Sequence, residues 1–276
     1  LEQALSYDRG EIVVGPDSGL VAHWPLDEGS GNSTADVSGF GSDASLLNGA
    51  SWGSDATRGS YVVFDGTDDR IETAFSYALA DTDDFTWSWW AKKEATSHSG
   101  SIMVGNRYGG TGSESLEFIK FMPNKAAFAD TGSAANIEDY NYSDLPSNQW
   151  HHYAMVKDGT SYQWYVDGVA QGSPVTINYN ETSPLPFLIG GDDDGTGTKV
   201  NEHFEGCIDD VVLYRSALTS VQVTDVMNGS YALTIPMAAA ALGSAANLND
   251  GSTWENGQPP VAGFNYLIPD TGNVRG

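Results

Sequence analysis

The sequence of 276 residues is short of basic residues, with 12 Lys and Arg against 37 Asp and Glu, which gives a formal net charge of −25. Nucleic-acid binding depends mainly on Lys and Arg that neutralise phosphates, so this balance excludes a nucleic-acid partner. Anionic membrane surfaces are disfavoured for the same reason. No run of about 18 apolar residues occurs, and the sequence therefore predicts no membrane insertion.

Cysteine is almost absent as well. Cys207 is the only one, so no disulfide can form within the chain, and we expect a small buried residue at this position. The first residues, Leu1 to Leu5, lack the basic start and the apolar stretch of a signal peptide. Because the chain does not begin with Met, we interpret it as a mature or excised part of a longer protein.

Aspartate, glycine and aromatic residues are plentiful. Of the 37 acidic residues 25 are Asp, and the chain holds 32 Gly, 8 Trp and 13 Tyr. Asp favours turns and cation ligation, whereas Glu favours helices, so the composition predicts a protein of strands and loops with calcium sites. The aromatic residues provide enough apolar surface for a core. The acidic surface also fits a saline or marine habitat, where salt screens self-repulsion.

Alternation of apolar and polar residues dominates the chain between residues 18 and 230 and predicts many short strands. Asp158-Gly159 predicts a hairpin between Gln149–Lys157 and Ser161–Val166, and one helix is expected over Thr219–Met227. Strands with turns every 8 to 15 residues are typical of an all-β antiparallel sandwich. Residues 1–17 are expected to be an N-terminal extension strand. Residues 231–276 are expected to be a C-terminal segment, either a linker or the start of a following β domain.

Several short sequence motifs follow one another along this region. They are residues 20–31 (LVAHWPLDEGSG), 63–69 (VFDGTDD), 85–91 (FTWSWWA), 150–156 (WHHYAMV), 164–168 (WYVDG) and 204–214 (FEGCIDDVVLY). In this order they resemble the LamG-like, concanavalin A-like lectin/glucanase family over residues 18–230. The resemblance implies a jelly-roll sandwich of two curved antiparallel sheets, often with a structural calcium at one rim. It also implies a protein of the kind that many bacteria secrete or display.

The turn Asp65–Asp69 is the predicted calcium site, because a tight Asp-Gly turn presents carboxylates and carbonyls together. Asp65 and Asp68 are the first two expected ligands. Strand alternation places Asp209 on the side of the apolar Val211 and Leu213, where a carboxylate needs a cation or hydrogen bonds, so Asp209 is the third. Asp210, Asp27 and Glu28 are further candidates. The alternative is that these acids serve only as turn residues and caps held by backbone amides.

Candidate ligand contacts lie in loop-like stretches. Tyr108, Tyr140 and Tyr142 are expected to stack on sugar rings, since loop aromatics offer flat apolar area with a polar handle. The acidic run Asp192, Asp193 and Asp194 is expected to accept hydrogen bonds from sugar hydroxyls or to hold a second calcium, unless it is simply a solvated loop. Trp24, Trp87, Trp89, Trp150 and Trp164, in contrast, fall in alternating strands and are expected in the core.

The sequence predicts a protein without catalytic activity. The pair of Glu residues around an Asp on one strand, used by related glycoside hydrolases, does not occur. The predicted function is a secreted or surface-displayed, calcium-stabilised module that binds a glycan or polysaccharide. The alternative is a structural subunit of an extracellular filament, sheath or adhesin. In that case Glu11–Val14 or Phe264–Ile268 would pair with an open sheet edge of a second copy or of a neighbouring domain.

Overall fold

The computed structural model describes residues 19–76, 83–95, 101–107, 118–129, 137–177, 186–191, 202–231, 246–247 and 274–275. The chain divides into two compact units, one formed by Leu20–Gly229 and the other by Leu1–Gly19 with Ser230–Gly276. In the second unit the described strands are a short parallel pair, β18 (Ala246–Asn247) and β19 (Val274–Arg275). The terminal segments Glu11–Val14 and Phe264–Ile268 lie outside the described residues.

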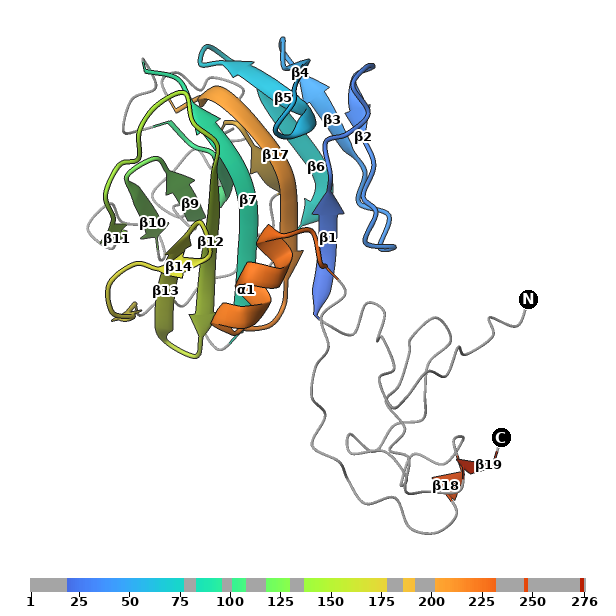
Figure 1. The fold of residues 1–276 in the computed structure, drawn as a ribbon, viewed down its shortest axis with the longest axis vertical. Coiled ribbons are helices and arrows are strands. Elements are labelled where there is room, and N and C mark those ends of the chain that lie inside the picture. The colour runs from blue at the N-terminus through green and yellow to red at the C-terminus, as the bar shows by residue number, and fades with distance from the viewer. Residues whose placement is uncertain are drawn as a thin grey trace, which may run out of the picture. The chain divides into compact units, whose positions relative to one another are not determined.

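The first unit consists of two large antiparallel sheets (Figure 1). Sheet A has the order β14-β13-β12-β7-β17-β5-β4, with β1 also paired to β17 and β15 to β13. Its strands are β1 (Leu20–Trp24), β4 (Ser51–Asp55), β5 (Gly59–Asp65), β7 (Phe85–Lys93), β12 (His151–Asp158), β13 (Ser161–Val166), β14 (Val169–Ala170), β15 (Val175–Thr176) and β17 (Glu205–Tyr214).

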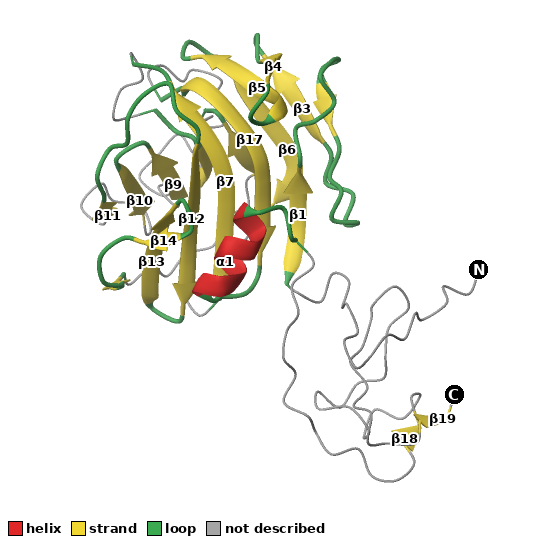
Figure 2. Ribbon diagram, viewed as in Figure 1, coloured by secondary structure: helices red, strands yellow, loops and turns green. Residues whose placement is uncertain are grey.

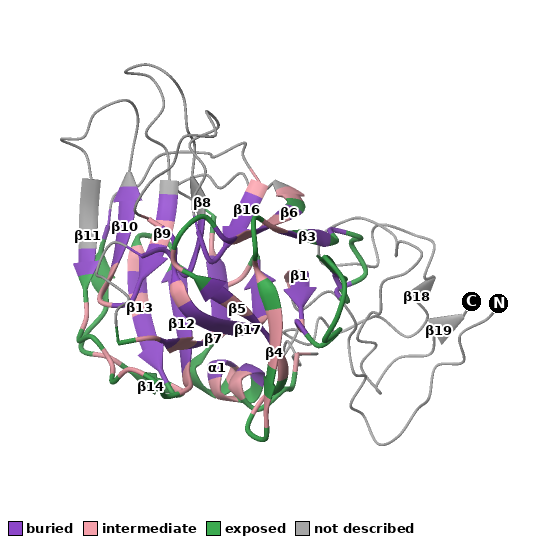
Figure 3. Cartoon of the chain, turned by 90° about the horizontal axis from the view of Figure 1, so that it is seen from above, coloured by how far each residue is buried: buried purple, intermediate pink, exposed green. Residues whose placement is uncertain are grey.

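Sheet B has the order β11-β10-β9-β8-β16-β6-β3-β2. Its strands are β2 (Ser33–Thr34), β3 (Ala44–Leu47), β6 (Arg70–Ser76), β8 (Val104–Arg107), β9 (Phe118–Met122), β10 (Lys125–Ala129), β11 (Ile137–Asn141) and β16 (Pro186–Ile189). Figure 3 shows the two sheets from above as two layers with buried positions along the strands of both. The predicted all-β antiparallel sandwich is therefore confirmed.

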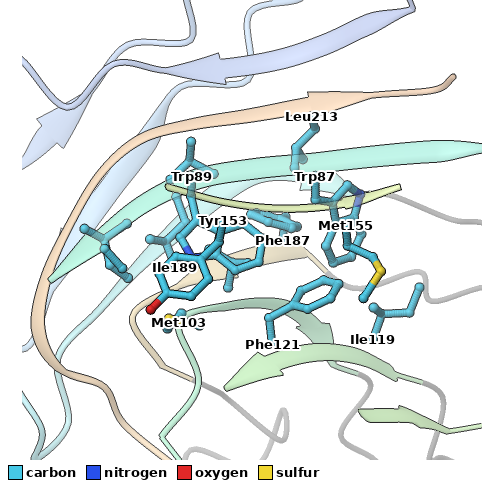
Figure 4. Close-up of a cluster of buried hydrophobic side chains, with 14 of the residues drawn as sticks. Trp87, Trp89, Met103, Ile119, Phe121, Tyr153, Met155, Phe187, Ile189 and Leu213 are labelled. Carbon is cyan, nitrogen blue, oxygen red and sulfur yellow. The ribbon is translucent and has the colours of Figure 1, made fainter. Parts of the chain in front are cut away.

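Aromatic side chains fill the space between the sheets (Figure 4). Trp87 and Trp89 of β7 alternate with polar Ser88, so both indoles point inward while Ser88 faces the other side of the sheet. Phe121 of sheet B packs edge-on to Trp87 at 5.5 Å between ring centroids and parallel to Trp164 at 5.8 Å. Of the five tryptophans expected in the core, Trp24, Trp87, Trp89 and Trp164 are fully buried. Trp150 is half-buried instead and contacts Tyr61 and Lys92.

The helix α1 (Ser220–Met227) is the one helix among the described residues (Figure 2). Thr219 caps its N-terminus, and Gln222 completes a capping box with the backbone of Thr219. Val223 and Val226, three residues apart, form its buried face. The predicted helix and the predicted hairpin, which pairs β12 with β13, are both confirmed.

Candidate functional site

A groove of about 620 Å³ opens where the end strand of sheet B, β11, faces the segment that carries β14 and β15 at the end of sheet A. A hydrogen bond of 3.2 Å from the Tyr140 hydroxyl to the Gln171 carbonyl joins the two sides. The described lining consists of Tyr140, Asn141, Tyr142, Ser143, Gln171, Gly172, Ser173, Val175, Thr176 and Ile177. None of these described side chains carries a formal charge, so this part of the groove is a neutral surface on a strongly acidic protein.

The two tyrosines of the groove are not the exposed loop residues that the sequence predicts. Tyr140 belongs to β11 and is 7% exposed, and the Tyr142 ring stacks on Trp164 with 4.1 Å between centroids. Both hydroxyls are used inside the protein, since Tyr142 donates to the Met122 carbonyl as Tyr140 does to Gln171. Burial raises the pKa of both phenols, which keeps them neutral. The tyrosines therefore build the floor of the groove and do not offer hydroxyls to a ligand.

Four other side chains of the lining are available for hydrogen bonds. Asn141, Ser143, Ser173 and Thr176 are exposed, and no hydrogen bond joins their side chains to another described residue. Amide and hydroxyl groups both donate and accept hydrogen bonds. Asn141 and Ser143 are sequence neighbours of the predicted tyrosines, whereas Ser173 and Thr176 belong to the β14–β15 segment, which lies far from β11 along the chain and which the sequence alone does not bring to the groove. Tyr108, Asp192, Asp193 and Asp194 lie outside the described residues.

The predicted calcium turn brings three carboxylates together at the connection between β5 and β6. Ligand atoms of Asp65, Asp68 and Asp69 all lie within 4.8 Å of one another. Gly66, with a φ of +78°, permits the sharp bend, and the Asp65 carboxylate accepts a hydrogen bond from the Thr67 N–H at 2.8 Å. The structure thus brings Asp65 and Asp68 together and adds Asp69, which the same sequence phrase contains.

Asp69 is the buried member of this group. It is 2% exposed, and its Oδ2 accepts from the Asp65 N–H at 2.8 Å, whereas its Oδ1 has no hydrogen-bond partner. Burial, and then the charges of Asp65 and Asp68, raise the pKa of Asp69. A buried carboxylate oxygen without a partner beside two other carboxylates has the chemistry that a hard cation such as calcium requires.

Asp209 does not join this turn. Glu205 of β17 pairs with Asp65, and Asp209 lies four residues further along the strand, a separation of about 13 Å at ~3.3 Å per residue. A bulge between Asp209 and Val212 in the pairing with β7 breaks the alternation, and Asp210 has a φ of +55°. As a result Ile208 and Val211 both face the core, while Asp209 faces the outside of sheet A.

The cation beside Asp209 is an arginine of the protein. Arg58 donates from Nε to Asp209 at 2.7 Å and from Nη2 to Asp210 at 3.3 Å, and its guanidinium lies 4.4 Å from the Trp90 ring centroid. Asp210 is also paired with His23 at 2.8 Å. Burial raises the pKa of Asp209 to about 7, although Arg58 opposes the shift. The expectation that Asp209 and Asp210 complete the calcium site is therefore wrong.

Asp27 and Glu28 are also separate from the turn. Burial and the charge of Asp210 raise the pKa of Asp27, and Arg58 opposes the shift, so Asp27 lies near the group formed by Arg58, Asp209 and Asp210. The Glu28 carboxylate accepts from the Ala35 N–H at 2.8 Å and acts as a loop cap. Among the described residues, the acids that come close enough to share one ion are Asp65, Asp68 and Asp69.

Two antiparallel sheets packed around an aromatic core, with a groove at one end, define a β-sandwich of the jelly-roll class. The family model described as "Concanavalin A-like lectin/glucanases superfamily" matches residues 65–224, more than half of the chain. The chain belongs to this superfamily. A search of curated proteins found no match.

In the parts of the chain that the structure describes, no helix has the length and apolar character needed to span a membrane.

Solved structures share the fold at low sequence identity. Domain 4 of AbnA, an extracellular GH43 arabinanase from Geobacillus stearothermophilus in complex with arabinotriose, has a TM-score of 0.57 and 20% identity, covering 75% of this chain and 97% of that one. The binding domain of Paraclostridial Mosquitocidal Protein 1 has a TM-score of 0.55 and 14% identity, covering 78% and 53%. Trypanosoma rangeli sialidase in complex with sialic acid has a TM-score of 0.54 and 18% identity, covering 79% and 34%. The fold thus occurs in enzymes and in binding domains alike.

Proposed function

We propose that the sandwich is a non-catalytic glycan-binding module and that the groove beside β11 is its binding site. The observation that carries the proposal is the set of four exposed side chains, Asn141, Ser143, Ser173 and Thr176, whose hydrogen-bonding groups are unused around a rigid floor. Sugars present many hydroxyls, and neutral amide and hydroxyl groups match them as donors and acceptors. The arabinotriose complex of the AbnA domain supports a glycan as the ligand class.

A binding role is favoured over a catalytic one by the groove chemistry. Glycoside hydrolysis typically uses two carboxylic acids that flank the scissile bond. The described lining of the groove contains no carboxylate. We place the module outside the cell, either secreted or displayed on the surface, and the extracellular arabinanase that shares its fold supports this location.

Substitutions in the groove test the site. Asn141→Ala and Thr176→Ala are each expected to weaken glycan binding several-fold, since one hydrogen bond contributes about 1 kcal/mol. The double variant is expected to lose at least tenfold in affinity, which corresponds to about 1.4 kcal/mol. A glycan array identifies the ligand, and isothermal titration calorimetry with the strongest binder measures the loss.

Thr57→Ala is the matched control, because Thr57 is an exposed threonine in the turn between β4 and β5 and does not line the groove. It is expected to bind like the unchanged protein. No binding to any glycan on the array, or an equal loss in Thr57→Ala, would reject the proposed site.

We further propose that calcium binds at Asp65, Asp68 and Asp69 and stabilises the fold. Calcium that binds only the folded state at a hundredfold excess over its dissociation constant is expected to raise the free energy of unfolding by about 2.7 kcal/mol. Thermal unfolding in calcium and in EDTA measures this difference. Asp68→Asn should remove most of this calcium-dependent stabilisation, because it takes away one of the three carboxylates of the group.

Asp225→Asn is the control for charge, since it also removes one negative charge but lies on α1, away from the turn. It should keep the full calcium effect. If calcium leaves the unfolding temperature of the unchanged protein the same, the site does not bind calcium.

A further inference from the structure

The groove and the acidic turn lie far apart in the sandwich. Asp69 directly precedes β6, and Tyr140 and Asn141 belong to β11, with β16, β8, β9 and β10 between them in sheet B. Five steps of ~4.8 Å between neighbouring strands give a separation of about 24 Å. A calcium ion at the turn is therefore out of reach of a ligand in the groove.

We propose that the groove binds uncharged glycans by direct contact and that calcium takes no part in that contact. This inference rests on the proposed function of the groove and names the class of glycan that it takes. It separates the protein from lectins in which a calcium ion bridges the sugar and the protein.

The described lining of the groove disfavours charged sugars. A carboxylate or sulfate that enters the groove loses water and gains no cationic partner from the described lining, which makes its transfer costly. The net charge of −25 adds a long-range repulsion against polyanions. An uncharged sugar meets neither penalty, and the exposed Val175 offers apolar surface to its ring while Asn141 and Thr176 offer hydrogen bonds.

The described lining of the groove has no carboxylate to hold a bridging cation, and contacts within the protein keep the groove in shape. Calcium takes six to eight oxygen ligands, and several of these are usually carboxylates. The described lining supplies no carboxylate. The two sides are held by the bond from Tyr140 to the Gln171 carbonyl, and the floor is held by the stack of Tyr142 on Trp164. A site held in this way is organised before the ligand arrives, so little ordering cost remains at binding.

Calorimetric titrations of the full chain test the inference. The probes are neutral oligosaccharides of arabinan, xylan, galactan and β-glucan, with an oligogalacturonate as the anionic counterpart, each in millimolar calcium and in excess EDTA at a temperature where circular dichroism shows the chain folded. We expect the affinity for the best neutral probe to change by less than twofold on chelation. We expect the oligogalacturonate to bind at least tenfold more weakly.

Thr176→Lys tests the electrostatic part of the argument. A cation placed in the groove is expected to raise the affinity for the oligogalacturonate at least tenfold, whereas Thr57→Lys, with the same added charge outside the groove, should leave it low. A tenfold loss of neutral binding on chelation, or a preference of the unchanged protein for the oligogalacturonate, overturns this inference and leaves the glycan-binding function standing. Absence of binding to every probe overturns both.

Discussion

Replacing Arg58 by alanine should lower the free energy of unfolding by about 3 to 5 kcal/mol at pH values above about 7, where Asp209 is ionised and the variant leaves a buried charge without its partner. The Asp209 side chain is 3% exposed, and its Oδ2 accepts from the Arg58 Nε at 2.7 Å. Its other oxygen, Oδ1, has no hydrogen-bond partner, so nothing else replaces the guanidinium. The variant also loses the contact of the guanidinium with the Trp90 ring. Chemical denaturation of both proteins measures the difference.

The size of this loss should depend on pH. Burial raises the pKa of Asp209 to about 7, above its value of about 3.9 in an unfolded chain. Between about pH 3.9 and about pH 7 the Asp209 carboxyl keeps its proton in the folded state but releases it in the unfolded chain. The contribution of Asp209 to stability is therefore full below the lower value and is lost as pH rises toward about 7. Without Arg58 the pKa of Asp209 rises further. Arg58→Ala should therefore be least harmful near pH 5 and most harmful above pH 7.

Two further variants identify the buried charge as the cause. Arg58→Ala combined with Asp209→Asn should recover much of the lost stability, because the uncompensated carboxylate is gone. Lys92→Ala breaks a pair with Asp55 at 3.4 Å whose side chains are 19% and 30% exposed, and it should cost only about 1 kcal/mol. Equal losses in Arg58→Ala and Lys92→Ala, or no recovery with Asp209→Asn, would contradict the explanation.

The bulge in β17 places Asp209 beside Arg58, and it is also the reason why strand alternation gives the wrong side for Asp209. Strict alternation from Leu213 and Val211 places Asp209 in the core, and the same alternation correctly predicts the inward face of β7. The extra residue at Asp210 turns Asp209 to the outside of sheet A, where it accepts a hydrogen bond from Arg58. Two adjacent aspartates between the apolar Ile208 and Val211 are the one local signal of this change.

Features fixed by neighbouring residues could be predicted, whereas features made by distant segments could not. The Thr219 cap, the hairpin between β12 and β13 and the turn at Asp65–Asp69 each depend on a few consecutive residues. The groove depends on β11 meeting the β14–β15 segment, and the direction of the tyrosines depends on Trp164 from a third strand. The composition of β11 alone shows none of these contacts.

Replacing Trp164 by alanine is the other substitution with a large expected effect, a loss of about 3 to 5 kcal/mol in the free energy of unfolding. Trp164 is fully buried and contacts four aromatic rings from other elements. They are Trp89, Phe121, Tyr142 and Tyr153, at centroid distances between 4.1 and 5.8 Å. Removing the indole leaves a cavity that these rings cannot close, because Trp89, Phe121 and Tyr153 are held by strands of both sheets and the Tyr142 hydroxyl is bound to the Met122 carbonyl.

The same substitution should reach the groove, since Tyr142 loses the ring on which it stacks at 4.1 Å. Trp164→Phe keeps an aromatic face under Tyr142 and should retain more of the stability and of the glycan affinity than Trp164→Ala. Trp52→Ala is the control, because Trp52 is a half-buried tryptophan on β4 whose indole donates to the Gly31 carbonyl away from the groove. It should lose less stability and no glycan affinity. If Trp52→Ala and Trp164→Ala lowered both quantities equally, the groove floor would not depend on the stack with Trp164, and general destabilisation would account for the effect.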